Sequence, residues 1–132
     1  MTPHDAMERI NVLLAHAWMV RTFLKHGEEI QDDAELLEVH RMIFDYTRAV
    51  EPSRERGDVE DYLRRAKGKL PKLRRVAELL AREYPRVSQH TNFQMAAASL
   101  TGVVQQIEEV LRSVAPPDAQ PPSAREPRLP EA

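Results

Sequence analysis

The chain has 132 residues, of which 42% are apolar and 30% are charged, and its formal net charge is -2. This length and composition are typical of a single soluble globular domain, and the small net charge gives no general attraction to nucleic acid or to a membrane surface. The chain contains no cysteine, which excludes disulfides, cysteine nucleophiles and thiolate metal sites. No export signal or membrane-spanning segment is evident, so we expect a cytoplasmic protein without a membrane partner.

The first predicted helix covers residues 2–25. Thr2, Pro3 and Asp5 have the order of an N-cap, a first-turn proline and a capping acid. Gly27 is a natural stop for the helix. The inward-facing stripe is expected to consist of Met7, Ile10, Leu14, Ala17 and Leu24.

The second predicted helix begins near Asp32 or Asp33 and runs to about Val50. It should end at Glu51-Pro52-Ser53, because a residue that precedes proline disfavours helical geometry. Its apolar residues recur at alternating steps of three and four, which indicates one buried face. That face should consist of Leu36, Val39, Ile43, Tyr46 and Val50.

The third predicted helix runs from about Asp58 to Tyr84 and is closed by Pro85. Gly68 and Pro71 lie in its middle, where proline removes a backbone hydrogen bond and bends the helix. The apolar rhythm passes through this point in phase, so we expect one kinked helix; a break at residues 68–70 is the alternative. The expected seam is Val59, Leu63, Ala66, Leu70, Leu73, Ala77, Leu80 and Tyr84.

The fourth predicted helix is capped by Ser88 and runs to about Val114. Its apolar side chains keep the same alternating spacing, which fits one helix to a partner helix. This seam should consist of His90, Phe93, Ala97, Leu100, Val104, Ile107, Leu111 and Val114. The last segment, 115–132, is rich in proline and predicts a disordered tail.

These elements predict an all-α fold with one domain, an antiparallel up-down-up-down four-helix bundle over residues 1–114, followed by the flexible tail at 115–132. The first two helices carry more apolar residues than a single stripe needs. The surplus predicts a second interface, most simply a symmetric dimer; burial of the same residues within one wide bundle face is the alternative. The expected interface residues are Trp18, Met19, Phe23, Leu37 and Phe44.

The middle of the third helix is basic, which suggests a surface for nucleic acid or another polyanion. The alternative interpretation is an ordinary solvated helix face, because no aromatic residues interleave with the basic ones for base stacking. The anion-binding candidates that share its outward sector are Arg64, Lys72, Arg75 and Arg82.

Arg86 and His90 stand in the sequence Arg-Val-Ser-Gln-His. This pair resembles the arginine and histidine of the HEPN ribonucleases, helical bundles in which the two residues are separated by four to six positions. Here three residues intervene, so the spacing departs from that of the family, and the family is not assigned. The resemblance would make Arg86 and His90 catalytic; the alternative is that His90 closes the end of the core.

His16 and His40 are the candidates for a metal site. Each lies about a dozen residues from the turn between the first two helices, so the two imidazoles should be level with each other. Two histidines alone make a poor closed site, and the chain lacks the Glu-x-x-His pairs of carboxylate-bridged metal bundles. The alternative is a structural role at the edge of an apolar face.

The sequence therefore predicts a non-enzymatic interaction protein without a cofactor, whose partner is a second copy of itself or another helical protein. Two other hypotheses remain. One is nucleic-acid binding through the third helix, with or without ribonuclease activity, and the other is metal binding through His16 and His40.

Overall fold

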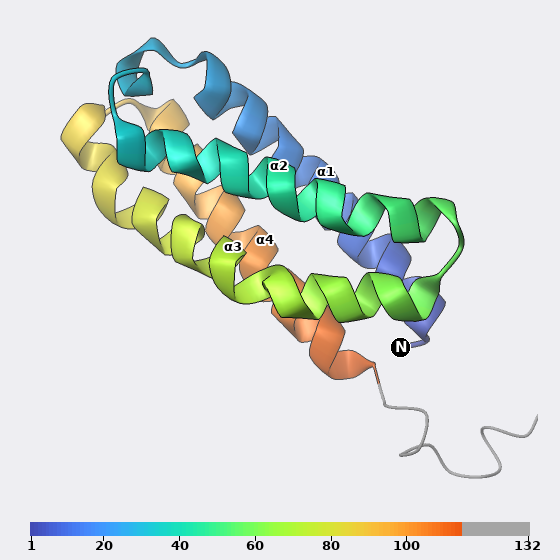
Figure 1. Ribbon diagram of the computed structural model, residues 1–132. Helices are drawn as coiled ribbons and strands as arrows, with labels where there is room; N and C mark the ends of the chain where they lie inside the picture. The colour runs from blue at the N-terminus through green and yellow to red at the C-terminus, as the bar shows by residue number, and fades with distance from the viewer. Residues whose placement is uncertain (115–132) are drawn as a thin grey trace, which may run out of the picture.

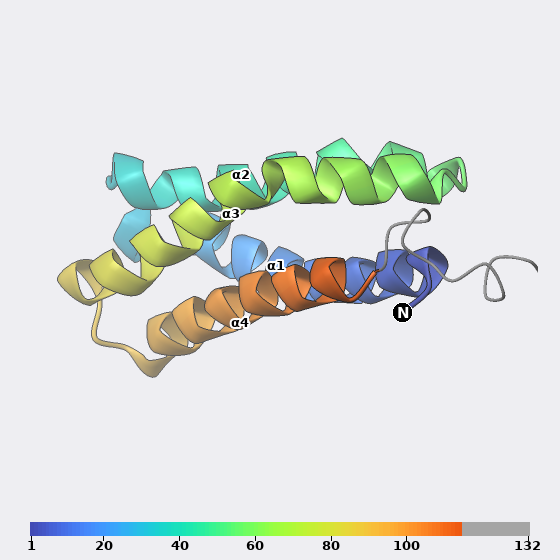
Figure 2. The same cartoon turned by 90° about the horizontal axis from the view of Figure 1, so that it is seen from below.

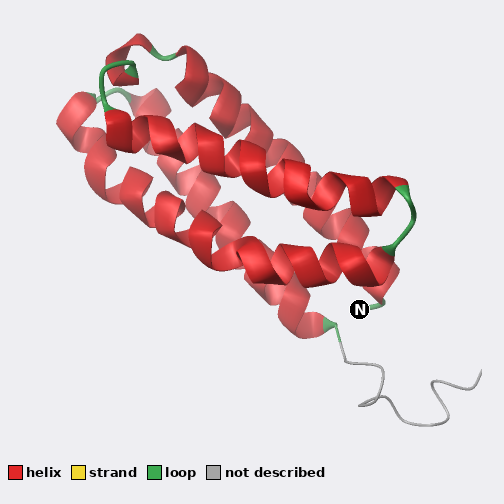
Figure 3. Cartoon of the chain, in the orientation of Figure 1, coloured by secondary structure: helices red, strands yellow, loops and turns green. Residues whose placement is uncertain are grey.

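The computed structural model describes residues 1–114, and helices account for most of them (Figure 1, Figure 3). No strand occurs in this part of the chain, which confirms the predicted all-α class. None of these helices combines the length and apolarity needed to cross a lipid bilayer. The predicted tail, 115–132, lies outside the described residues. The elements are α1 (Pro3–His26), the short 3-10 helix η1 (Glu28–Ile30), α2 (Ala34–Glu55), α3 (Val59–Val87) and α4 (Thr91–Ser113).

The four α-helices form an antiparallel bundle. Each packs against its neighbours in the sequence, and α1 also packs against α4 to close the ring. Short connections reverse the chain after each helix, so α1 and α3 run in one direction and α2 and α4 in the other (Figure 1). The chain before α1 meets the end of α4, where the Met1 ammonium group donates a hydrogen bond to the Ser113 carbonyl oxygen at 3.2 Å. The predicted up-down-up-down topology is therefore confirmed.

The starts of α1, α2 and α3 are fixed by side-chain caps. Oxygen atoms of Thr2, Asp33 and Asp58 each accept a hydrogen bond from the backbone N–H three residues later, at 3.0 to 3.1 Å. Such a bond satisfies one of the N–H groups that have no partner in the first helical turn. These three starts agree with those predicted from the sequence.

The predicted end of the second helix is wrong, because α2 continues through Pro52 to Glu55. This proline removes only one backbone donor, and it lies at an exposed position near the helix end. Two side chains anchor the extra turn. The buried Ser53 hydroxyl donates to an Asp61 carboxylate oxygen of α3 at 2.6 Å, and Arg54 forms an ion pair with α1 at 2.9 Å. Contacts with other helices thus override the local effect of the proline.

The boundary between the third and fourth helices also differs from the prediction. α3 passes through Pro85 and ends at Val87, where Ser88 is the residue at its C-terminal cap. His90, not Ser88, caps the start of α4. Ser88 instead accepts a hydrogen bond from the His90 backbone N–H at 3.1 Å. His90 is exposed and does not close the core.

α3 is one continuous helix despite Gly68 and Pro71. Figure 2 shows that its first half runs beside α2 and that its second half bends away from α2. Pro71 accounts for the bend, because it has no N–H to donate and its ring crowds the carbonyl group one turn earlier. The prediction of a single kinked helix is confirmed, and the alternative of a break is wrong.

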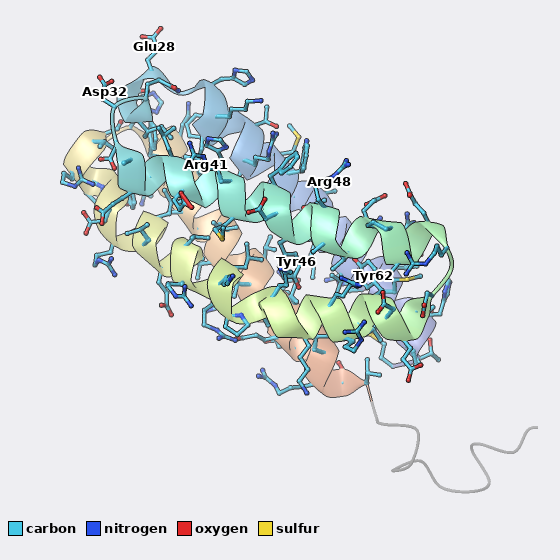
Figure 4. The ribbon with its side chains drawn as sticks, in the orientation of Figure 1. Glu28, Asp32, Arg41, Tyr46, Arg48 and Tyr62 are labelled. Carbon is cyan, nitrogen blue, oxygen red and sulfur yellow. The ribbon has the colours of Figure 1, made fainter. Side chains whose placement is uncertain are left out.

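Two tyrosines join α2 to the first half of α3 (Figure 4). The Tyr46 hydroxyl donates a buried hydrogen bond to the Ala66 carbonyl oxygen at 2.7 Å. Tyr62 is fully buried nearby, and its hydroxyl has no hydrogen-bond partner among residues 1–114. Burial raises the pKa of both phenols well above their ordinary value, so both stay neutral. Tyr62 replaces the predicted Leu63 as the inward side chain of this turn.

Most residues of the predicted seams lie in the core, but α1, α3 and α4 bury wider faces than single seams, whereas the buried apolar residues of α2 are those of its predicted seam. Pairs of adjacent residues are buried together, such as Leu13 with Leu14 and Val103 with Val104. A globular bundle buries such a broad face, whereas a coiled coil buries a narrow stripe. The predicted seam residues Val59, Leu63, Tyr84, Leu111 and Val114 are only half-buried. The buried apolar residues outside the predicted seams are Ala6, Leu13, Val20, Ile30, Tyr62, Val76, Ala96, Val103 and Val110.

Truncation of a central core residue tests this packing. Leu100 is fully buried, so Leu100→Ala should lower the free energy of unfolding by about 2–5 kcal/mol. Gln94→Ala, at an exposed position of the same helix, should change it by less than about 0.5 kcal/mol. Urea unfolding followed by circular dichroism measures both values. Equal values for the two variants would contradict the packing described here.

Candidate functional site

Two aromatic rings and two arginines form a cluster on the outer side of α1 and α2. The ring centroids of Trp18 and Phe44 lie 6.0 Å apart. The Arg21 guanidinium carbon lies 4.2 Å from the Trp18 centroid and 5.2 Å from that of Phe44, and the Arg48 guanidinium carbon lies 5.8 Å from Phe44. A cation above a ring face is attracted by the electrons of the ring. We call these four residues the aromatic–arginine cluster.

The outer side of α1 also carries an apolar ridge, which consists of Val12, Ala15 and Met19. Val12 is 49% exposed and Met19 is 66% exposed. Met95 of α4 is 57% exposed. A hollow of about 340 Å³ lies on the α2 side of the ridge and one of about 320 Å³ on the α4 side, and Met19 lines both. A ridge between two hollows is a shape onto which another helix can pack.

The five predicted interface residues do not form a single surface. Met19 and Phe44 are exposed, and Trp18 is half-buried beside them. Phe23 and Leu37 pack against the core instead, and the Phe23 ring meets that of Phe93 edge to face, with 5.0 Å between the centroids. Packing within one chain therefore uses part of the predicted apolar surplus.

Met95 is a surface residue that the sequence analysis missed. It follows the buried Phe93 by two residues, so it points off the apolar seam of α4. Its exposure was readable from the same periodicity that identified the seam. On α1, Val12 is likewise exposed.

The two candidate histidines lie in different surroundings. His16 is exposed and lines the hollow between α1 and α4. His40 is half-buried, and burial lowers its pKa, with further lowering by Arg21 and Arg41. Nowhere in residues 1–114 do three or more histidine or acidic side chains gather closely enough to hold a metal ion. Within the described residues, His16 and His40 therefore belong to no group of three such side chains.

Arg86 is engaged by acids of α2 and of its own helix. Its guanidinium lies 2.7 Å from Asp33, 2.9 Å from Glu83 and 3.8 Å from Glu35. The hydrogen bond with Asp33, followed by the one with Glu83, raises the pKa of Arg86 above its ordinary value. These contacts clamp the end of α3 to the start of α2.

His90 has a separate role, because its Nδ1 atom accepts a hydrogen bond from the Asn92 backbone N–H at 3.0 Å. The ring therefore caps α4. Arg86, in contrast, points its charge toward acids of α2 and α3. The contacts of the two residues diverge, and they do not converge on a common pocket.

The four anion-binding candidates on α3 divide into two groups. Arg64 forms an ion pair with Asp61 in the first turns of the helix. Lys72, Arg75 and Arg82 line a hollow of about 490 Å³ between α2 and α3. We call this hollow the α2–α3 groove. The structure therefore brings three of the four candidates to one place.

No protein-family model, curated protein or solved structure matches this chain. The two surfaces that stand out from its fold are the outer side of α1 and the α2–α3 groove.

Asp61 is the centre of a charge network at the turn between α2 and α3. Its carboxylate accepts hydrogen bonds from the Ser53 hydroxyl at 2.6 Å and from Arg65 Nε at 2.8 Å. Arg64 and Arg56 also form ion pairs with it. The bond from Ser53, followed by the one from Arg65, lowers the pKa of Asp61 well below its usual range. The network holds the turn and engages Asp61 on both of its carboxylate oxygens.

This network should make stability depend on pH in the acid range. A carboxylate whose folded-state pKa is lowered stabilises the fold above its unfolded-state pKa of about 3.9, and loses that contribution as the pH falls toward its folded-state pKa. Asp61→Asn should therefore cost most near pH 7 and progressively less below about pH 4. Urea unfolding at several pH values measures this difference.

The matched control is Asp45→Asn, which changes an exposed carboxylate of α2 that has no ion pair with residues 1–114. Its effect on unfolding should be small throughout the pH series. A cost of Asp61→Asn that stays constant from pH 7 to about pH 2 would show that the charge of Asp61 is not what holds the turn.

Proposed function

We propose that this protein is a non-enzymatic interaction protein that self-associates through the outer side of α1. The observation that carries the proposal is the apolar ridge, which leaves Val12 and Met19 in solvent between two hollows. In the proposed dimer, α1 of one copy packs antiparallel against α1 of the second copy. Such a contact uses the same patch on both copies and closes at two chains.

The apolar surface supplies the attraction. Large apolar side chains that lie together on a surface favour association, because burial removes their area from water. The ridge joins the aromatic–arginine cluster on one side, and Met95 lies across the other hollow. A methionine adapts its shape to a partner more readily than a branched side chain does. In a two-fold symmetric dimer, each of these side chains occurs twice in the contact, once from each copy.

The charges of α1 select the antiparallel orientation. Asp5 lies at its start and Lys25 near its end, while Glu8 is already paired with Arg54 of α2. An antiparallel pair centred near Ala15 places Asp5 of one helix beside Lys25 of the other. It also places Val12 of one copy opposite Met19 of the second. A parallel pair would bring like charges together, which disfavours it.

The other hypotheses receive less support from the same residues. The donors of Arg86 face three carboxylates, and His90 caps a helix, so neither residue is placed to act on RNA. Arg64 is neutralised by Asp61, which interrupts the basic surface of α3. A different helical protein on the apolar ridge remains the closest alternative to a second copy.

A charged residue in the middle of the ridge should prevent dimer formation. We expect the unaltered protein to have twice its chain mass of 15.2 kDa in light scattering, and Met19→Asp to have the mass of one chain. An isolated carboxylate buried in an apolar contact is strongly unfavourable, which is the reason for this expectation. Circular dichroism checks that the variant remains helical.

The matched control is Ala81→Asp, which places the same charge at an exposed position of α3. This variant should keep the mass of the dimer. A monomeric unaltered protein over a wide concentration range would refute self-association. A dimer that survives Met19→Asp would place the interface elsewhere.

A further inference from the structure

The bend in α3 opens the α2–α3 groove. Beyond Pro71 the helix diverges from α2 (Figure 2), although Arg86 near its end still pairs with Asp33 at the start of α2. The groove lies between α2 and this second half of α3. Its volume of about 490 Å³ is within the range of sites for small molecules. The residues that line it are Glu38, Met42, Lys72, Arg75, Val76, Glu78, Leu79 and Arg82.

The floor of the groove is apolar. Val76 is buried, and Met42 and Leu79 are half-buried against the core. These three side chains present aliphatic surface to the groove from both helices. A saturated hydrocarbon chain matches such a floor, because the contact removes apolar area from water on both sides.

The rim of the groove carries cations with unused charge. Lys72 and Arg75 are exposed, and within residues 1–114 neither has an acid within 4.0 Å. Arg82 contacts only Glu83, at 3.1 Å. The side chains of Lys72 and Arg75 are long enough to fold over the groove or to extend from it. They are therefore suited to hold a single anionic head group.

Two acids limit how much negative charge the groove accepts. Glu38 and Glu78 also line it, and Glu38 is engaged by Arg41 at 3.6 Å. The three cations exceed these two acids by one charge. Glu78 follows Arg75 by one helical turn, so the acids lie among the cations of the rim. A net excess of one positive charge suits a single carboxylate better than a strand with many phosphates. The charge balance thus favours a monoanion over nucleic acid.

We infer that the α2–α3 groove binds an amphipathic monoanion of the fatty-acid class. Its carboxylate pairs with Lys72 and Arg75, and its aliphatic chain lies over Met42, Val76 and Leu79. The groove shares no lining residue with the apolar ridge or its two hollows, so this inference does not depend on the proposed dimer.

Nuclear magnetic resonance of the full-length 15N-labelled protein tests the inference, with sodium octanoate as the probe below its micelle concentration. Saturable shifts should be confined to residues 38–46 and 69–82, which flank the groove. The neutral probe 1-octanol should bind at least about tenfold more weakly, because it cannot form the charge-assisted contacts. Shifts centred on α1, or no saturation by octanoate, would overturn the inference.

Charge variants identify the rim. Arg75→Glu should weaken octanoate binding by at least about tenfold. Lys67→Glu makes the same charge change at an exposed position of α3 outside the groove, and should weaken binding less than about twofold. Equal effects of the two variants would overturn the inference. So would a short single-stranded oligonucleotide that displaces octanoate from the groove. The spectrum of each variant shows whether it is folded.

Discussion

The burial of broad apolar faces of α1, α3 and α4, together with the single stripe of α2, in a shared interior determines the rest of this structure. Residue pairs such as Leu13 with Leu14 and Val103 with Val104 fill the centre of the bundle, and this fixes the rotation of each helix about its axis. Once α1 is fixed in this way, Val12 and Met19 have no place in the core and face solvent. The exposed ridge is thus a consequence of core packing on a helix that has too many apolar residues for one face. Self-association would bury the apolar side chains of this exposed ridge without any change in the fold.

The prolines show how contacts between helices modify local rules. Pro71 bends α3 without ending it, because the apolar seam continues in phase on both sides and the tyrosine at position 46 ties α2 to the helix before the bend. The same bend separates the second half of α3 from α2 and creates the groove with its apolar floor. Pro52 and Pro85 lie near helix ends, where ion pairs and a hydrogen bond from Ser53 hold the last turns. A residue usually regarded as a helix breaker therefore shapes a groove here.

Much of the fold was predictable from the sequence, because seams and caps are local signals. Thr2, Asp33 and Asp58 begin their helices as predicted, since each side chain acts within its own first turn. The helix ends were not predictable, because Arg54 and Arg86 stabilise them through residues distant in the sequence. The candidate sites were only partly predictable for the same reason, because they also depend on contacts between residues distant in the sequence. Periodicity identified the apolar surplus and the basic sector of α3, but only the packed structure separates the engaged side chains from the exposed ones.

The central claim is that the outer side of α1 pairs with itself, and the absence of cysteine makes one measurement especially direct. Ala15→Cys places a single thiol in the middle of the exposed ridge, close to the proposed two-fold axis. Helices in contact at this point bring the two thiols within the short distance that a disulfide requires. Mild oxidation should therefore convert this variant to a covalent dimer, while Ala81→Cys on α3 stays monomeric under the same denaturing electrophoresis. Failure of Ala15→Cys to cross-link, or equal cross-linking by both variants, would contradict the account.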